Sequence, residues 1–390
     1  MRPRWWLAPA AVVPAIALLA GCGSARPAAA RPAGPPVTLS LATAAGYPGG
    51  SWAVLVMGGS QAAHNNFWQV LVRPAGKTAW QLATPPGVAS NGGISVAATG
   101  GRSLVAVLRP SQKLAFSPLA RSADNGTRWV QDGLLDVPLA AGVSALAAAP
   151  DGELIALTRG DGVQVSVHPG AAWTRLASAT AVAVAARSCG LTRLTAAGYT
   201  PSGTALLAGA CARPGQAGIF ADQAGRWTGA GPRLPGPLAR LPVTVLQLAR
   251  AGPASAALLL AGSGRNARLL GAWSSRDGRQ WRLSAPYPLG GARPSSATWV
   301  AGRLGVLLAD GRAVSVPGPG AAWRALPTLP AGASALPAGA ATLAAAPSGG
   351  GFQALTARGG RLSVWTLTPG TGTWRRSQAI SVAIPYGSSG

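Results

Sequence analysis

The chain has 390 residues, with 33 Lys and Arg against 9 Asp and Glu, a formal net charge of +24, 54 Gly and 34 Pro. Its single Glu and two Lys cannot supply the charged outer faces of a soluble helical bundle, so the composition excludes that class. The Gly and Pro content stays below the share typical of low-complexity disorder, and the length suits a turn-rich β fold.

Residues 1–21 have the pattern of a bacterial export signal. Arg2 and Arg4 precede an apolar run that ends at Ala20, which is too short and too interrupted by proline to predict a membrane span. Small residues then lead directly into Cys22. This ending resembles the lipobox of bacterial lipoproteins, which implies cleavage before Cys22 and a diacylglycerol on its sulfur. An ordinary signal peptide followed by an unrelated cysteine is the alternative.

We therefore predict three parts: a signal peptide (1–21), a lipidated Cys22 with a Pro/Ala-rich tether (22–36) and a folded domain (37–390). The lipid would hold the mature chain on the extracytoplasmic face of the cell membrane. After cleavage the net charge is +22, which would attract anionic lipids or wall polymers in a salt-dependent way. A high-GC codon bias is a second source of this arginine excess. The arginines are scattered and no nucleic-acid motif accompanies them, so no nucleic-acid partner is predicted.

One pattern recurs along the whole folded domain. A Gly, one to three mostly small or polar residues and a Trp open a short segment of alternating polarity. Successive Trp residues are 49, 44, 54, 54, 42 and 51 positions apart, which fits an array of seven units. The tryptophans are Trp80, Trp129, Trp173, Trp227, Trp281, Trp323 and Trp374.

Each period of about 49 residues contains short Val-, Leu- and Ala-rich runs separated by turn residues. Such runs predict β-strands joined in hairpins, and three or four of them make one propeller blade. We therefore predict an all-β fold, a single β-propeller of seven four-stranded blades, with six or eight as alternatives. The strand expected at residues 380–384 would pair with the first blade and remove a free sheet edge.

Two copies of the repeat carry a longer motif. Ser122, Asp124, Gly126 and Trp129 match S-x-D-x-G-x-x-W, and Ser275, Asp277, Gly278 and Trp281 give the same motif one residue shorter. These segments resemble the Asp-box, or BNR repeat, of sialidase-like propellers. The resemblance implies a turn between the third and fourth strands of a blade and a structural role. In such a turn the carboxylate can accept hydrogen bonds from turn amides and the Gly can adopt a positive φ.

The residues of a sialidase active site are not recognisable. Glu153 is the single Glu, and it follows a Pro-Asp-Gly turn, which predicts a solvated hairpin residue. Asp132 and Asp136 are close in sequence, but Asp132-Gly133 reads as a turn rather than as half of a glycosidase pair. No catalytic residue, side-chain metal site or cofactor is predicted, whereas a calcium ion held by backbone carbonyls stays open.

Two further features concern stability and binding. In an oxidising compartment Cys189 and Cys211, 22 residues apart, can form a disulfide between neighbouring strands, worth about 3 kcal/mol; free thiols are the alternative. His64, Asn65 and Trp68 lie in the one polar insertion that also carries aromatics, and they are our candidate binding loop. Interblade packing is the other interpretation of Trp68.

These features predict a monomeric, non-enzymatic lipoprotein that acts as a binding or scaffold module of the cell envelope through the mouth of the propeller channel. Its partner would be an envelope protein or a wall glycan. The alternative is a divergent glycan-active, sialidase-like hydrolase or lyase. A resemblance to propeller factors that hold partly built membrane complexes is a third hypothesis.

Overall fold

The structure is a computed structural model that describes residues 39–47, 50–58, 66–85, 93–100, 102–109, 117–135, 143–158, 162–185, 189–329, 341–347, 350–358, 360–368 and 371–382. All of them belong to one compact unit, Pro36–Gly390. The predicted signal peptide, Cys22 and the tether lie outside the described residues. No helix in the described ranges is long and apolar enough to span a membrane.

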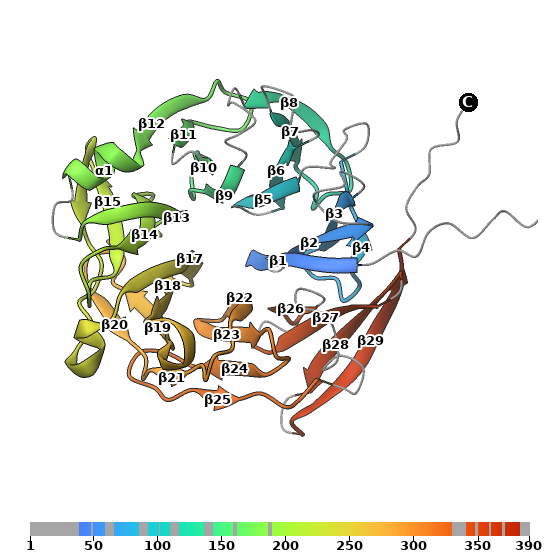
Figure 1. Ribbon diagram of the computed structural model, residues 1–390. Coiled ribbons are helices and arrows are strands. Elements are labelled where there is room, and N and C mark those ends of the chain that lie inside the picture. Colours follow the sequence, from blue (N-terminus) through green and yellow to red (C-terminus); the bar gives the residue numbers. More distant parts are fainter. Residues whose placement is uncertain are drawn as a thin grey trace, which may run out of the picture. The chain divides into compact units, whose positions relative to one another are not determined.

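The fold of this unit is a β-propeller, as the sequence predicts. Consecutive strands form antiparallel sets that we call blades 1 to 7 (Figure 1). Blade 1 contains β1 (Leu39–Tyr47), β2 (Gly50–Gly58), β3 (Asn66–Arg73) and β4 (Gln81–Leu82); blade 2 contains β5 (Gly93–Gly100), β6 (Ser103–Arg109), β7 (Ser117–Ser122) and β8 (Val130–Leu135); blade 3 contains β9 (Val143–Ala148), β10 (Leu154–Thr158), β11 (Gly162–Ser166) and β12 (Thr174–Ser178).

The remaining blades follow the same order. Blade 4 contains β13 (Leu191–Tyr199), β14 (Ala205–Cys211), β15 (Gly218–Gln223) and β16 (Arg226–Gly229); blade 5 contains β17 (Val243–Ala251), β18 (Ala254–Ala261), β19 (Arg268–Ser274), β20 (Trp281–Leu283) and β21 (Tyr287–Pro288); blade 6 contains β22 (Pro294–Val300), β23 (Arg303–Leu308), β24 (Ala313–Val316) and β25 (Arg324–Ala325); blade 7 contains β26 (Ala341–Ala345), β27 (Phe352–Arg358), β28 (Arg361–Thr368) and β29 (Thr373–Ser381). In the described ranges three short helices lie in connections: α1 (Ala179–Ala185), η3 (Gly236–Arg240) and η4 (Gly264–Asn266).

The blades are arranged around a common axis with their first strands innermost (Figure 1). From blade 2 to blade 7 the first strands contact one another in chain order, and β26 contacts β1. Blade 1 contacts blade 2 through β2 and β3. One residue pair, Ala210 with Thr244, joins blades 4 and 5 into a single sheet.

The hydrophobic core lies between neighbouring blades. The second strand of a blade is buried on both faces, so its sequence is a continuous apolar run such as Leu154–Thr158. Alanine is frequent in these runs and brings the sheets close together. The clusters of buried side chains each combine residues from two adjacent blades.

The seven tryptophans of the repeat occupy equivalent positions in successive blades, which explains the regular spacing of the sequence pattern. Each lies at or just before the start of the fourth strand of its blade and packs against the preceding blade. In blades 2, 6 and 7 the indole N–H also donates to a carbonyl of that neighbour, from Trp129 to Ala83 (2.7 Å), Trp323 to Ala285 (2.8 Å) and Trp374 to Pro327 (2.9 Å). The repeat therefore specifies the interface between blades.

Within the described ranges, no strand of blade 7 pairs with a strand of blade 1. The segment that we expected to pair with blade 1 overlaps the end of β29 at Ile380 and Ser381, and β29 pairs with β28, in a register from Arg361 opposite Ser381 to Thr368 opposite Thr373. The Val382 N–H likewise donates to the carbonyl of Gly360 in blade 7. The predicted pairing with blade 1 is therefore wrong for residues 380–382, and residues 383–384 lie outside the described ranges.

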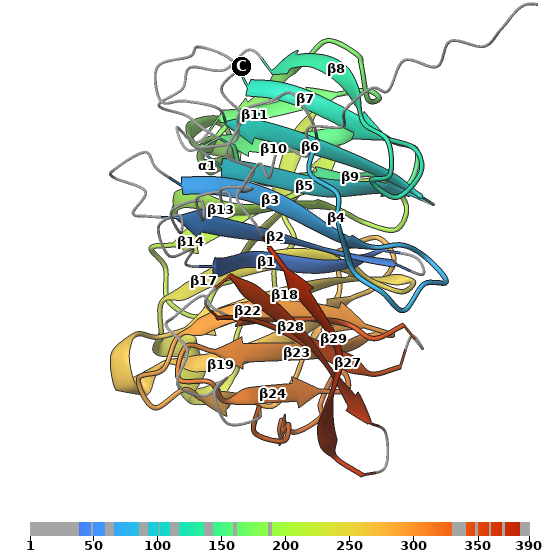
Figure 2. The ribbon, with the colours of Figure 1, turned by 90° about the vertical axis from the view of Figure 1, so that its right-hand side faces the viewer.

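Side chains join the two blades instead. Figure 2 shows blade 7 (red) beside blade 1 (blue). The amide of Gln378 in β29 bonds both backbone groups of Trp80: its Oε1 accepts from the Trp80 N–H (2.7 Å), and its Nε2 donates to the Trp80 carbonyl (2.8 Å). The Trp80 indole donates to Oε1 of Gln353 (2.9 Å). We call Trp80, Gln353 and Gln378 the closure clasp.

Arg73 adds a buried cation to the same junction. It is 1% exposed, and its Nη2 donates to Ser51 Oγ (2.9 Å) and to the carbonyl of Ala345 in blade 7 (3.1 Å). Its guanidinium also lies 5.9 Å from the centre of the Trp80 ring. Neutral acceptors and an aromatic face thus balance a charge that burial would otherwise disfavour.

Candidate functional site

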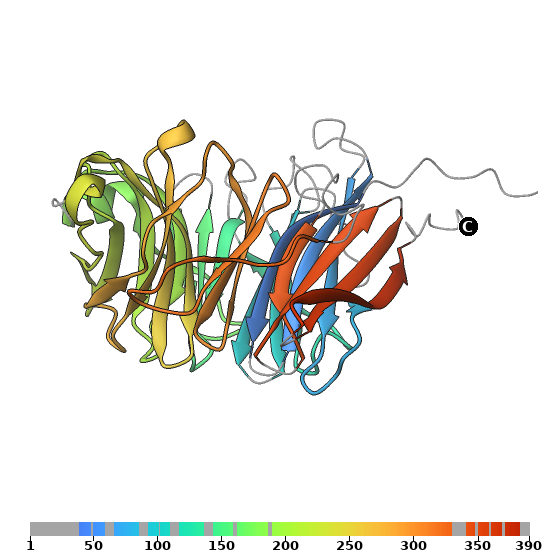
Figure 3. The same ribbon diagram turned by 90° about the horizontal axis from the view of Figure 1, so that it is seen from below.

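The topology gives the propeller two different faces. Because the strands of a blade alternate in direction, turns between the second and third strands lie on the same side as the connections between blades. We call this side the loop face; η4, a coiled segment on it, projects at the upper edge of Figure 3. The opposite side, with the first-to-second and third-to-fourth turns, is the hairpin face.

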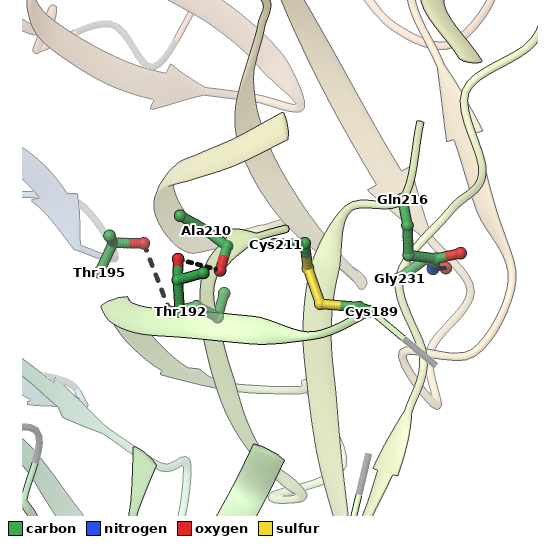
Figure 4. Close-up of a disulfide and its surroundings, with 8 residues drawn as sticks. Cys189, Thr192, Thr195, Ala210, Cys211, Gln216 and Gly231 are labelled. Atoms are coloured by element: carbon green, nitrogen blue, oxygen red, sulfur yellow. Dashed lines mark hydrogen bonds between the residues drawn. A yellow bond between two sulfur atoms is a disulfide. The ribbon is translucent and has the colours of Figure 1, made fainter. Parts of the chain in front are cut away.

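The disulfide fixes the loop face of blade 4. Cys189, just before β13, is joined to Cys211 at the end of β14 (Figure 4). The bridge is buried, and the Ala212 N–H donates to the carbonyl of Gly190 beside it (2.9 Å). The sequence-based pairing of Cys189 with Cys211, on neighbouring strands, is thus present in the structure.

The turn after β14 packs closely against η3. Gly215 has φ +70°, and a Cβ at this position would lie 2.4 Å from the carbonyl oxygen of Ala239, so only glycine fits. Its N–H donates to the Leu241 carbonyl and its own carbonyl accepts from the Leu234 N–H, both at 2.8 Å. Gln216 Nε2 donates to the Gly231 carbonyl (3.1 Å; Figure 4).

Further backbone hydrogen bonds continue this layer across blades 5 and 6. The N–H groups of Gly262, Leu289 and Ala309 donate to the carbonyls of Pro242 (2.8 Å), Ala267 (3.1 Å) and Arg293 (2.8 Å), respectively. The segments 211–217, 230–242, 262–267, 287–293 and 309–312 therefore form one hydrogen-bonded layer, which we call the loop shelf.

The loop shelf is rich in exposed arginine. It carries six arginines, each exposed: Arg213, Arg233, Arg240, Arg265, Arg293 and Arg312. Its single carboxylate is Asp310, and Arg312 neutralises it at 2.7 Å. The hydrogen bond to Asp310 raises the pKa of Arg312, whose Nη2 also donates to the Leu289 carbonyl (3.1 Å).

The hairpin face of the same three blades has a more balanced charge. Arg226, Arg276, Arg279, Arg303 and Arg324 lie there with two carboxylates, Asp222 and Asp277. Both faces of these blades are therefore basic, but the excess of arginine over aspartate is larger on the loop shelf.

The two Asp-box segments are turns on the hairpin face, between the third and fourth strands of blades 2 and 5. In the first, Asp124 accepts from the Arg128 N–H and from Ser122 Oγ, and Ser122 Oγ accepts from the Gly126 N–H, all at 2.8 Å. The hydrogen bond from the Arg128 amide has the largest effect on the Asp124 carboxyl. Together with the bond from Ser122 it holds the pKa of Asp124 below its usual value. Gly126 has φ +80°, and Trp129 packs between blades.

The second segment has the same organisation. Ser275 donates to Asp277, which also accepts from the Arg279 N–H (3.1 Å), and both bonds lower the pKa of the Asp277 carboxyl. Gly278 has φ +72°, and the Trp281 indole packs against blade 4. Both aspartate side chains therefore accept hydrogen bonds within their own turns.

The candidate binding loop is divided. His64 and Asn65 lie outside the described residues. Trp68 belongs to β3 rather than to a loop, and its side chain is partly buried against the apolar cluster between blades 1 and 2. This placement agrees with the packing interpretation of Trp68.

Glu153 lies in the hairpin turn between β9 and β10, as predicted, but it is half-buried rather than fully solvated. Its Oε1 accepts a hydrogen bond from the phenol of Tyr199 in blade 4 (2.9 Å). Tyr199 is 3% exposed, and burial, followed by the bond to Glu153, raises the pKa of its phenol far above the usual value. This phenol stays protonated, whereas a tyrosine nucleophile requires the opposite shift.

Asp132 also differs from its prediction as a turn residue. Asp132 and Gly133 lie within β8, at a bulge where the register with β7 shifts. The carboxylate pairs with Arg121 at 3.2 Å. Asp136, its proposed neighbour, lies outside the described ranges.

Every carboxylate among the described residues has a structural partner. Each accepts a hydrogen bond from a turn amide or from a neighbouring side chain; these residues are Asp124, Asp132, Asp151, Glu153, Asp222, Asp277 and Asp310. The described ranges also contain no group of three or more His, Cys, Asp and Glu that could hold a metal ion.

Sequence reasoning missed both the loop shelf and the closure clasp. A signal for the shelf is present: in the fourth to sixth periods, arginines stand beside Gly and Pro in segments such as Gly231–Pro235 and Gly291–Pro294. Once strands are assigned, these segments fall on one face.

No family model and no curated protein matches this chain. Solved structures with similar folds include a GH74 xyloglucanase from Xanthomonas campestris (TM-score 0.57, 12% identity, covering 87% of this chain and 55% of that one) and a puromycin-hydrolyzing peptidase from Mycobacterium tuberculosis (0.50, 14%, 87% and 53%). YCF48 from Cyanidioschyzon merolae has a TM-score of 0.49 at 12% identity, covering 83% and 94%. This chain spans about half the length of the first two proteins. At these identities the similarity establishes the propeller fold alone.

Proposed function

We propose that this protein is a binding or scaffold lipoprotein of the cell envelope that engages its partner through the loop face of the propeller. The hydrogen-bonded loop shelf is the observation that carries the proposal. Five segments from three blades are held in one layer, so their exposed side chains are pre-positioned for a ligand and little ordering is needed on binding.

The lipid anchor and the BNR assignment belong to the same proposal. The residues before Cys22 support the anchor, and the turns at Asp124 and Asp277 support the relation to BNR propellers. Substituting Cys22→Ala should move the protein from the membrane fraction to the soluble fraction. A variant that stays in the membrane fraction after washing with high salt would contradict the anchor.

The alternative, a divergent glycan-active enzyme, has less support. The seven described carboxylates are engaged in turns and neighbour contacts, and the Tyr199 phenol is held neutral. No observation in the described ranges favours a catalytic pair.

Site-specific photo-crosslinking in cells tests the binding role. A photoreactive residue replaces Ser263, an exposed position in the turn between β18 and β19 on the loop shelf. The matched control replaces Pro253, which is exposed in the turn between β17 and β18 on the hairpin face of the same blade. We expect a recurrent product from position 263 that is absent from position 253.

Two results would contradict the proposal. Equal products from both positions, or none from position 263, would argue against a binding role of the loop face. Shortening of isolated wall glycan by the purified protein would instead establish the enzymatic alternative.

A further inference from the structure

We propose that the loop shelf binds a linear polyanion, a polymer that carries phosphate or carboxylate groups along its length. This inference rests on the proposed binding role and names the ligand chemistry of that face. It depends on three features of the shelf: available guanidinium groups, a fixed backbone and the absence of an exposed apolar centre.

Four guanidinium groups of the shelf are available for a ligand. The side chains of Arg233, Arg240, Arg265 and Arg293 are exposed and have no hydrogen bond or ion pair within the part of the chain that the structure describes. The one shelf carboxylate, Asp310, is already paired with Arg312 and does not compete for them.

The positions of these four arginines are fixed by the backbone. Arg233 and Arg240 directly precede Leu234 and Leu241, whose backbones are hydrogen-bonded to Gly215, and Arg293 supplies the carbonyl that accepts from Ala309. Arg265 lies in η4, and a Cβ added to Gly291 would lie 3.8 Å from its Cγ. Guanidinium groups bind phosphate and carboxylate through paired N–H donors, so four of them spread over two blade junctions fit a repeated anion better than a single one.

The apolar surface argues against a membrane or a protein as the main ligand. The large hydrophobic side chains that are most exposed in the described ranges are Leu82, Val130, Leu134, Val167 and Val184, and none of them is on the shelf. Leu238, Leu241 and the one shelf aromatic, Tyr287, which packs on Trp323, are half-buried. Insertion into a bilayer needs exposed apolar side chains, and protein interfaces are enriched in aromatic ones.

A binding assay with a charge-matched control tests the inference. The lipidated protein is held in phosphatidylcholine nanodiscs and titrated separately with inorganic polyphosphate, with polygalacturonate and with vesicles of phosphatidylglycerol and phosphatidylcholine. The shelf variant is R233Q/R240Q/R265Q/R293Q. The control, R226Q/R276Q/R279Q/R303Q, removes the same charge from the hairpin face of the same blades.

We expect the wild type to bind at least one of the two polymers, with an affinity that falls as salt rises. The shelf variant should bind about ten-fold or more weakly, and the control should change by less than about three-fold. Binding of polyphosphate alone identifies a phosphate polymer, and binding of polygalacturonate alone identifies a carboxylate polymer. If the four-fold shelf variant loses its native circular dichroism, R240Q/R265Q replaces it and should bind about three-fold or more weakly.

Equal weakening in both four-fold variants would overturn the inference, because net charge alone would then explain the binding. Binding to the vesicles but to neither polymer would overturn it in favour of a membrane surface. The proposed function is tested separately by the crosslinking experiment. A protein partner crosslinked at position 263 together with no polymer binding refutes only the polyanion inference. Polymer binding in vitro without any crosslink in cells refutes the cellular binding role.

Discussion

Replacing Gln378 by alanine should open the junction between the first and last blades. Gln378 supplies two hydrogen bonds, at 2.7 and 2.8 Å, to the backbone of Trp80, a residue that is 2% exposed. Each such bond contributes about 1 kcal/mol, and a buried backbone group left without a partner adds to the loss. We therefore expect the free energy of unfolding to fall by about 2 to 3 kcal/mol.

Urea unfolding followed by tryptophan fluorescence measures this loss, and hydrogen exchange at the Trp80 amide localises it. The matched control is Gln131→Ala, because Gln131 lies exposed on β8, the fourth strand of blade 2. It should cost less than about 0.5 kcal/mol. A loss for Gln378→Ala no larger than that of the control, or unchanged exchange at Trp80, would refute side-chain closure of the ring.

Three further predictions concern the disulfide, an interblade tryptophan and the buried phenol. Reducing the Cys189–Cys211 bridge should lower the free energy of unfolding by about 3 kcal/mol, measured by urea unfolding with and without reductant; an unchanged midpoint would contradict it. Trp323→Phe removes an indole donor to the preceding blade and should cost about 1 kcal/mol in the same assay, whereas no loss would show that ring packing alone suffices. The pKa of Tyr199 is raised by folding, so its contribution is complete below about pH 10 and declines above it as the unfolded phenol ionises. Tyr199→Phe should therefore flatten the fall of stability above pH 10, and identical pH profiles would contradict this.

The fold could be predicted from the sequence because one residue type recurs at its key interface. Each tryptophan of the repeat packs between two blades, so a pattern of single residues reports the tertiary arrangement. The disulfide and the two Asp turns were accessible for a related reason. Their partners lie 22 residues apart or less, within one period.

The closure clasp could not be predicted in this way. Gln378 and Trp80 are 298 positions apart, and a lone glutamine in a strand gives no sign of its partner. The strand predicted at residues 380–384 overlaps only the end of β29, and the pattern does not say which neighbour a strand will join. Trp68 and Glu153 illustrate the same limit, since packing and a cross-blade hydrogen bond decided their environments.

The loop shelf required knowledge of the topology. Successive arginines of the shelf are up to tens of residues apart in the sequence. They lie on one face because the second-to-third-strand turns and the connections between blades lie at the same end of the strands. From composition alone, codon bias is a sufficient explanation of the arginine excess. The gathering of six exposed arginines in one hydrogen-bonded layer of blades 4 to 6 follows from the topology, which composition does not report.

Closure by side chains also has a consequence for how this ring can change in evolution. Each blade is built from consecutive strands, so a gene duplication or deletion of one whole period would leave the strand pairing within every other blade intact. A ring closed by an exchanged strand would lose a partner strand in some of these events. Here only the few residues at the seam would need to adapt, and homologues with a different number of periods should vary at the positions of Trp80, Gln353 and Gln378 more than at the other tryptophans.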